Sequence, residues 1–404
     1  MALSDDIKAT VSLKAEVEAM GLTADRAASN PRRGDFAFPC PLHGNASPSF
    51  RVFERPGEVP GFYCHGCAAK GTVIDLVMGA EGLTFAAAVD RLARAHGIGR
   101  DAPDADTVAA RERAAAKRRA AQAEAMAQEA RDATANARDT WRRARPVQGA
   151  AGAILCNYLE ARTGRPGTPP PSLRIAPRLK AWAPPENPAD GPVEVYNGPA
   201  MVAAVGRRAT GFVGVHRTWI TETGRARMAD GVKVPKQMRG PCFGAPVMLT
   251  PAYADSLLVV GEGIETTLAV AWRLQDPAHP LWDRLDLPDA WRTRGVTAEA
   301  ALSLPSLAGG EAAPRTPREG RAPLASTEPD PGNPGWLPPE GHRGPVLILA
   351  DPSAKDPDAA RNHATRARAK LQARGVETAL AVPHDTWSSA ADFADLAATG
   401  DLDA

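Results

Sequence analysis

Cysteine and histidine residues at regular spacing constrain this chain more than any other feature. One pair lies in PCPLHGNASPSF and a second in YCHGC, and two residues separate the members of each pair: Cys40 and His43, then Cys64 and Cys67. Such spacing lets one tight turn aim both side chains at one ion, and the gap between the pairs is long enough for a hairpin. Because thiolate and imidazole suit tetrahedral zinc, the sequence predicts a closed, structural zinc site. His65 competes as a ligand, although its adjacency to Cys64 makes simultaneous binding awkward.

Length and composition limit the remaining possibilities. A chain of 404 residues, 44% of them hydrophobic, can bury several cores, and five cysteines are too few for a secreted disulfide framework. The apolar runs LLVV and VLILA are far shorter than the roughly 20 residues of a membrane span, and no secretion signal is evident. We therefore expect a cytoplasmic protein with no membrane partner. The formal net charge of +1 argues neither for nor against nucleic acid.

Four segments are expected, which together make a multidomain α/β protein. The first holds the Cys/His pairs, the second is an Ala- and Arg-rich helix, the third is mixed, and the fourth alternates strands with helices as a parallel sheet does. We place them at 1–100, 101–145, 146–250 and 251–404. Within the last, nine prolines at 309–345 and few apolar residues predict a disordered insertion or long surface loop.

Acidic residues follow successive strands of the fourth segment. Glu262 ends the strand of LLVVGEGIETTLAV, Asp351 ends that of VLILADPSAKDPDAA, and Asp392 stands in SAADFADL. In an open parallel sheet, ligands bind at the carboxyl ends of the strands. Carboxylates gathered there hold Mg²⁺ against phosphates, so we expect a metal site at this edge.

The N-terminal motifs resemble a known family. CPLHGNASPSFRV, FYCHGCAAKGTVIDLVM and LTFAAAVDRLA are similar to the zinc ribbon of bacterial and phage DNA primases of the DnaG-like type. The resemblance implies a ribbon that contacts single-stranded template DNA. Arg51 and Lys70 would then contact phosphates, whereas Phe50 and Phe62 are expected mainly in the ribbon core.

The fourth segment resembles a Toprim domain, the fold shared by DnaG-like primases, topoisomerases and some nucleases. The resemblance implies that Glu262, Asp351 and Asp392 are the catalytic acids. One position departs from the family pattern, because Ser353 stands where a second aspartate is expected. Either Asp356 or Asp358 supplies the missing carboxylate, or one metal is held weakly. The implied cofactor is Mg²⁺ or Mn²⁺, held by Glu262, Asp351 and one of these two aspartates.

The third segment is similar to the region that precedes Toprim in primases of phages, plasmids and integrated elements, on GPAMVAAV, GFVGVHRTWITETG and KVPKQMRG. Its basic residues are expected along the path of template and nucleoside triphosphates, because cationic side chains are the usual partners of phosphate oxygens. They are His216, Arg217, Arg225, Lys233, Lys236 and Arg239.

These resemblances imply a primase that makes short RNA primers on single-stranded DNA by metal-dependent nucleotidyl transfer. No phosphate-binding GxxxxGK[ST] loop occurs, so any helicase would be a separate partner. The alternative is a non-catalytic, single-stranded-DNA-binding or regulatory protein on a decayed primase scaffold, which Ser353 favours. A topoisomerase would need a nucleophilic tyrosine, and no tyrosine of this chain lies in a matching sequence context. A Toprim nuclease would not need a zinc ribbon.

Overall fold

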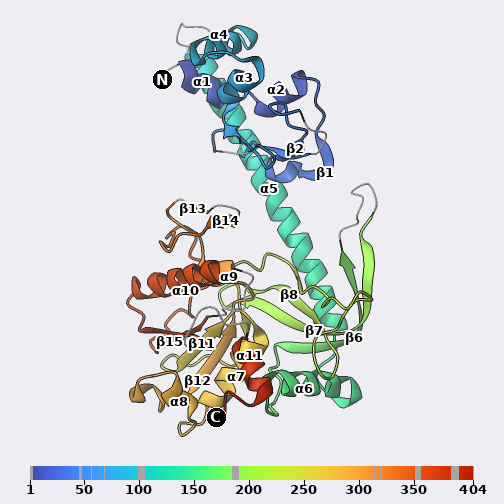
Figure 1. The fold of residues 1–404 in the computed structure, drawn as a ribbon, viewed down its shortest axis with the longest axis vertical. Helices are drawn as coiled ribbons and strands as arrows, with labels where there is room; N and C mark the ends of the chain where they lie inside the picture. Colours follow the sequence, from blue (N-terminus) through green and yellow to red (C-terminus); the bar gives the residue numbers. More distant parts are fainter. Residues whose placement is uncertain are drawn as a thin grey trace. The chain divides into compact units, whose positions relative to one another are not determined.

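A computed structural model describes residues 3–44, 48–55, 57–67, 69–98, 105–183, 191–313, 315–318, 321–350, 356–383 and 391–403. The chain folds into two compact units, each with its own core. The first is built mainly from Met1–Glu129 and the second from Ala130–Ala183 and Val193–Ala404 (Figure 1). Among the described residues, no helix is both long and apolar enough to cross a bilayer.

The N-terminal unit is a small antiparallel sheet covered by short helices. Its five strands follow in chain order: β1 (Asp25–Asn30), β2 (Asp35–Phe38), β3 (Phe50–Phe53), β4 (Gly61–Cys64) and β5 (Lys70–Gly71). The helices are α1 (Leu3–Thr10), α2 (Leu13–Ala19), α3 (Val73–Glu81) and α4 (Phe85–Ala95), and a short 3₁₀ turn spans Pro31–Arg33. Thr72 and Asp75 form a capping box that starts α3 directly after the last strand. Phe38, Phe50 and Leu76 are fully buried in this core.

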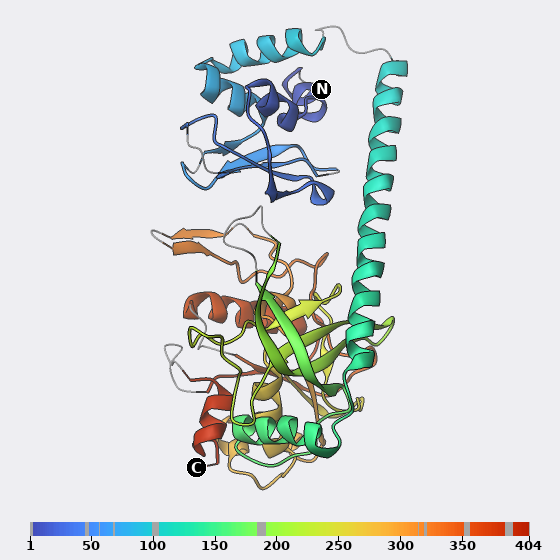
Figure 2. The same cartoon turned by 90° about the vertical axis from the view of Figure 1, so that its right-hand side faces the viewer.

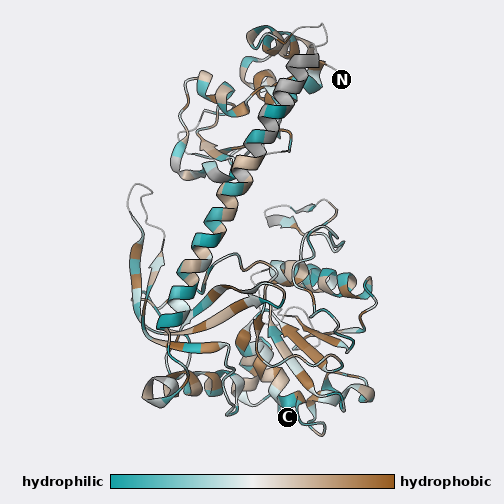
Figure 3. Cartoon of the chain, turned by 180° about the vertical axis from the view of Figure 1, so that it is seen from behind, coloured by the Kyte–Doolittle hydropathy of each residue, from teal (hydrophilic) through white to brown (hydrophobic). Residues whose placement is uncertain are grey.

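A long helix, α5 (Ala105–Arg143), leads from the first unit into the second. Figure 3 shows that much of its length is hydrophilic. Its last turns are different, because Ala137 and Ala144 are buried against the second unit. We conclude that packing attaches this end of the helix to the second unit.

In the second unit, the end of α5 is followed by α6 (Gly149–Thr163) and a four-stranded antiparallel sheet. The strands are β6 (Leu173–Ala183), β7 (Val193–Arg207), β8 (Gly211–Trp219) and β9 (Gln237–Arg239), paired in that order. Successive residues of a strand point to opposite faces, so each face has its own core. On one face Val215 and Trp219 pack with Ala137 of α5. On the other, Met201 and Ala203 pack with the rest of the unit.

A five-stranded sheet follows, in the order β10-β12-β11-β15-β16. Four of its strands are parallel and β10 is antiparallel. The strands are β10 (Val247–Met248), β11 (Leu257–Gly261), β12 (Val296–Ala300), β15 (Val346–Leu349) and β16 (Thr378–Ala381). Its helices are α7 (Ile264–Leu274), α8 (Leu281–Arg284), α9 (Leu304–Ala308), α10 (Pro357–Gln372) and α11 (Phe393–Thr399), with a 3₁₀ turn at Asp289–Trp291. The molecule is therefore a multidomain α/β protein.

The proline-rich segment, expected to be a disordered insertion or a long surface loop, makes specific contacts with α10 in its described part. Its described part forms a hairpin, β13 (Thr316–Arg318) and β14 (Arg321–Leu324), and β14 contacts α10 (Figure 2). Trp336 is fully buried, and the ammonium of Lys370 in α10 donates to the carbonyls of Leu307, Pro334 and Trp336 at 2.6–2.7 Å. A proline has no amide hydrogen, but its carbonyl can still accept a hydrogen bond, as that of Pro334 does. The buried Trp336 side chain adds apolar area that holds the loop in place.

Candidate functional site

The two Cys/His pairs meet at one end of the N-terminal sheet. The ligand atoms of Cys40, His43, Cys64 and Cys67 all lie within 4.8 Å of one another. The Cys40 and Cys67 sulfurs are 4.0 Å apart, and Cys64 Sγ is 3.7 Å from His43 Nδ1. Four donors around a zinc ion with Zn–S bonds of about 2.3 Å are separated by roughly 3.8 Å, so this set fits tetrahedral zinc.

Local structure explains how the sequence gathers these donors. Cys64 ends β4, and the amides of Leu42 and Gly66 donate to the sulfurs of Cys40 and Cys64. A Cβ atom at Gly66 would lie 2.8 Å from the His43 ring, so glycine is required for the ring to enter. The prediction of a Cys-His-Cys-Cys metal site therefore agrees with the geometry.

The ribbon residues expected to contact nucleic acid have different surroundings. Arg51 donates to both carboxylate oxygens of Asp35, at 3.0 and 2.5 Å, and to the carbonyl of Ala28. Its charge is therefore already balanced, whereas Lys70 is exposed on β5. Phe50 and Phe62 stack in the core with ring centroids 4.7 Å apart, as expected.

The expected acidic edge lies at the carboxyl ends of β11, β15 and β16. Glu262 occupies the turn between β11 and α7 and is half-buried. A Cβ atom at Gly261 would lie 2.8 Å from Thr267 Oγ1, so this glycine lets α7 start close to the strand. Asp351 and Ser353 lie outside the described residues.

Asp392 reaches the same region from another element. It caps α11 by accepting from the amide of Asp395 at 2.7 Å, and Thr266 in the first turn of α7 donates to it at 3.3 Å. Arg162 of α6 lies 3.9 Å from Asp392 and donates to Asp395 at 2.8 Å. A cationic side chain from α6 therefore accompanies the acids, which sequence reasoning did not identify.

Asp356 and Asp358 have a different partner from the one expected. Arg318 Nη1 and Nη2 both donate to the carboxylate of Asp356, and Nη1 also lies 3.7 Å from Asp358. Asp356 also caps α10 by accepting from the amide of Ala359 at 3.2 Å. The guanidinium from β13 thus lies where the sequence suggests a metal-binding carboxylate.

A buried ionic network lies beside the acids. The Tyr158 hydroxyl donates to Glu265 Oε1 at 2.5 Å, and Lys236 Nζ lies 3.4 Å from Glu265 Oε2. Burial alone would raise the pKa of Glu265, but Lys236 and the Tyr158 hydroxyl lower it to about 2. Burial and Lys236 together lower the pKa of His216 to about 3. Glu265 is therefore ionised and His216 neutral at pH 7.

The predicted basic residues divide between the two faces of the β6–β9 sheet. His216 and Lys236 belong to the buried network, and Arg225 donates to the carbonyl of Val234. Arg217 and Arg239 instead line a cavity of about 730 Å³ on the face that meets α5. Lys233 is exposed. The structure therefore groups His216, Arg225 and Lys236 on one side of the sheet and Arg217 with Arg239 on the other, and Lys233 belongs to neither group.

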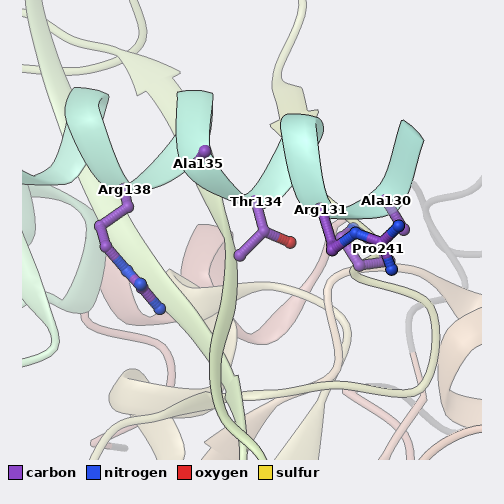
Figure 4. Close-up of a pocket in the computed structure, with 6 residues that line it drawn as sticks. All are labelled: Ala130, Arg131, Thr134, Ala135, Arg138 and Pro241. Atoms are coloured by element: carbon purple, nitrogen blue, oxygen red, sulfur yellow. The ribbon is translucent and has the colours of Figure 1, made fainter. Parts of the chain in front are cut away.

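A smaller cavity, of about 370 Å³, lies between α5 and Pro241 (Figure 4). Arg131 and Arg138 line it, and Arg138 stacks over the ring of Phe212 at 5.5 Å. Thr134 donates to the Val213 carbonyl at 3.2 Å. These contacts attach the end of α5 to β8.

Four zinc-binding donors on a small antiparallel sheet define a zinc-ribbon protein. Residues 7–107 match the family described as the CHC2 zinc finger, and residues 131–249 match a domain of unknown function, DUF7146. The N-terminal segment is therefore a CHC2 zinc ribbon of the DnaG type. The curated proteins that match over this segment are DNA primases.

Curated relatives match over the ribbon. The DNA primases of Streptomyces coelicolor, Thermotoga maritima and Escherichia coli K12 are 46%, 42% and 39% identical over 59 residues, 15% of this chain. These matches span only 9–10% of the relatives' own length. A solved structure of the Aquifex aeolicus primase, with zinc-binding and RNA polymerase domains, is 15% identical with a TM-score of 0.30, covering 98% of this chain and 82% of that one. At this TM-score we infer nothing about the second unit from that structure.

Proposed function

We propose that this protein is a DNA primase that synthesises short RNA primers on a single-stranded DNA template. The observation that carries the proposal is a CHC2 zinc ribbon of primase type in one chain with a parallel sheet whose strand β11 is followed directly by Glu262. Such a protein would act in the cytoplasm on template and nucleoside triphosphates, with any helicase as a separate partner.

In the proposed reaction, the 3′-hydroxyl of one nucleotide gives its proton to solvent, and its oxygen bonds to the α-phosphorus of the next nucleotide. The bond between the α-phosphorus and the bridging oxygen breaks, and pyrophosphate leaves. Glu262 and Asp351 would hold Mg²⁺ or Mn²⁺, since carboxylate oxygens are the donors these hard cations prefer. Asp356 or Asp358 would add a further carboxylate, and Asp392 would be the third catalytic acid. The bound ion would stabilise charge on the attacking and leaving oxygens.

The chain's own cations have a separate part in this proposal. Lys236 is partly exposed and is fixed by the buried carboxylate of Glu265, so its remaining protons can face a triphosphate. Arg162 accompanies Asp392 in the same way. Fixed cations neutralise phosphate charge without reorganising during the reaction.

The alternative is a non-catalytic template-binding protein on the same scaffold. The contact between Arg318 and Asp356 favours it, because the carboxylate that would compensate for Ser353 already has a cationic partner. Primer synthesis on single-stranded DNA with labelled nucleotides separates the two functions.

We expect synthesis by the wild-type protein at high Mg²⁺ or with Mn²⁺, and none by Asp351→Asn. Ser353→Asp should lower the Mg²⁺ concentration needed, because a carboxylate attracts a hard cation more strongly than a hydroxyl.

Glu262→Gln should abolish synthesis but keep affinity for single-stranded DNA, and that affinity should fall steeply with salt. If only Ser353→Asp makes primers, the non-catalytic alternative is correct.

A further inference from the structure

A buried arginine of the β6–β9 sheet, Arg217, forms no ion pair with a carboxylate in the part of the chain that the structure describes. Arg217 is 6% exposed, its Nη2 donates to Gln237 Oε1 at 2.8 Å, and its Nε has no hydrogen-bond partner. Among the described residues, neither Arg217 nor its neighbour Arg239 has an ion pair. Burial, reinforced by Arg239, lowers the pKa of Arg217 to about 10. An uncompensated buried charge is costly and calls for an anionic ligand.

The cavity around this arginine is strongly basic. Its walls are the last turn of α5 and strands β6, β7, β8 and β9, and its volume is about 730 Å³, within the range of small-molecule sites. Five cations line it: Arg143, Arg178, Lys180, Arg217 and Arg239. The one lining acid, Asp139, is paired with Arg143 at 2.8 Å. Lys180 is paired with Glu194 at 2.8 Å. Arg178, Arg217 and Arg239 therefore remain as lining cations for which no ion pair is seen among the described residues.

An aromatic ring stands at the rim of the cavity. Trp182 is 39% exposed, and its carbonyl accepts from Gln237 Nε2 at 2.7 Å. Gln237 thus joins Arg217 to the strand that carries the tryptophan. Arginine and an exposed indole ring are the side chains that proteins use for a phosphate and for a nucleobase.

The cavity is separate from the acidic edge. Arg217 and His216 are adjacent in β8, so their side chains point to opposite faces of the sheet. His216 faces Glu265 and Lys236, whereas Arg217 shares its face with Trp219, whose ring is 5.5 Å from the guanidinium. A ligand on Arg217 would therefore not compete for the residues around Glu262.

We propose that this cavity is a nucleotide-binding site, in which Arg217 and Arg239 hold the phosphate and Trp182 stacks on the base. The volume suits one nucleotide, either free or as one residue of a single strand. The site requires no divalent cation, because arginine alone supplies the charge. It also does not depend on primer synthesis, since none of its residues belongs to the acidic edge.

Titration calorimetry without added divalent cation tests the proposal. Adenosine 5′-monophosphate should bind the wild-type protein and adenosine should bind far more weakly. Arg217→Met and Arg239→Met should each weaken the nucleotide about tenfold or more, because each removes hydrogen bonds between charged groups. Trp182→Ala should weaken it about tenfold through lost stacking. Arg343→Met removes an arginine from an exposed pair with Asp255 and should change nothing.

Stability provides a second readout. Replacing an uncompensated buried charge by an apolar side chain should leave thermal stability unchanged or raise it, so Arg217→Met should lose ligand without losing stability. A single-stranded oligonucleotide that binds in an Arg217-dependent way, while the free nucleotide does not, identifies the source as a strand. Equal affinity in wild type, Arg217→Met and Arg239→Met, or no binding of either ligand, overturns the proposal.

Discussion

Two buried titratable residues of the second unit, Glu265 and His216, have pKa values that their neighbours shift. Glu265 has Tyr158 and Lys236 as partners, and His216 lies beside Lys236, Glu265, Arg225 and Arg217. The neutral ring avoids adding a second positive charge next to Lys236. This arrangement has a measurable consequence for stability.

Stability of the second unit should fall as the pH falls because of His216. The unfolded chain protonates this residue below about pH 6.5, but burial keeps it neutral in the folded protein until about pH 3. The unfolded state therefore binds more protons, and this residue alone should cost about 2 kcal/mol between about pH 7 and pH 5. Urea unfolding followed by tryptophan fluorescence measures it, because all eight tryptophans lie in the second unit.

The control for this prediction is His216→Gln, whose amide does not titrate. His363 and His342, whose pKa values burial also lowers, contribute equally to both proteins and cancel in the comparison. A loss of stability in His216→Gln as large as that of the wild type would contradict the assignment.

Local patterns were sufficient to predict some residues of the sites and not others. The four zinc donors are distinctive in type and close in sequence, so their spacing alone brings them together. Tyr158 and Glu265 are 107 residues apart and neither type suggests a partner, so only the fold reveals their contact. The pairing of Arg318 with Asp356 was hidden in the same way, behind a segment expected to be disordered.

Among the elements, α10 and the segment after α9 stabilise each other. The alternation of apolar runs with helical segments predicted the parallel strands β11 and β15 correctly, because continuous apolar runs are typical of buried strands. For the proline-rich segment, composition left a disordered insertion and a long surface loop open, and it gave no sign of the contacts that Trp336 and Lys370 make there, because a count of apolar residues takes no account of single placed side chains. Arg366 of the same helix donates to the carbonyls of Ser326 and Gly309, which adds to the attachment.

Lys370→Met should detach this segment from α10. Lys370 is 1% exposed, and its loss leaves two buried carbonyls and one half-buried carbonyl without their donor, so we expect a cost of about 3 kcal/mol. Thermal unfolding and the rate of proteolysis within 309–345 are the measurements. Arg368→Met, an exposed change on the same helix, should have little effect. Unchanged proteolysis in Lys370→Met would show that other contacts hold the segment.

At the scale of the whole molecule, the two units have separate sources of stability. The N-terminal core is formed by residues such as Ile7, Phe38 and Leu76 around the Cys/His site. The cores of the second unit contain none of these residues. A domain this small depends on its metal, because the free energy of zinc binding is also free energy of folding.

Loss of zinc should therefore unfold the ribbon and spare the second unit. Cys67→Ser removes one of four ligands, and we expect metal analysis to find about one zinc per chain in the wild type and none in this variant. Amide exchange in β2, β3 and β4 should become fast, while tryptophan-detected unfolding, which reports only the second unit, should stay within about 0.5 kcal/mol of the wild type. Cys156→Ser, on α6, is the matched control and should keep its zinc. Zinc retained in Cys67→Ser would exclude the four-ligand site, and a matching loss of stability in the second unit would show that the two units fold as one.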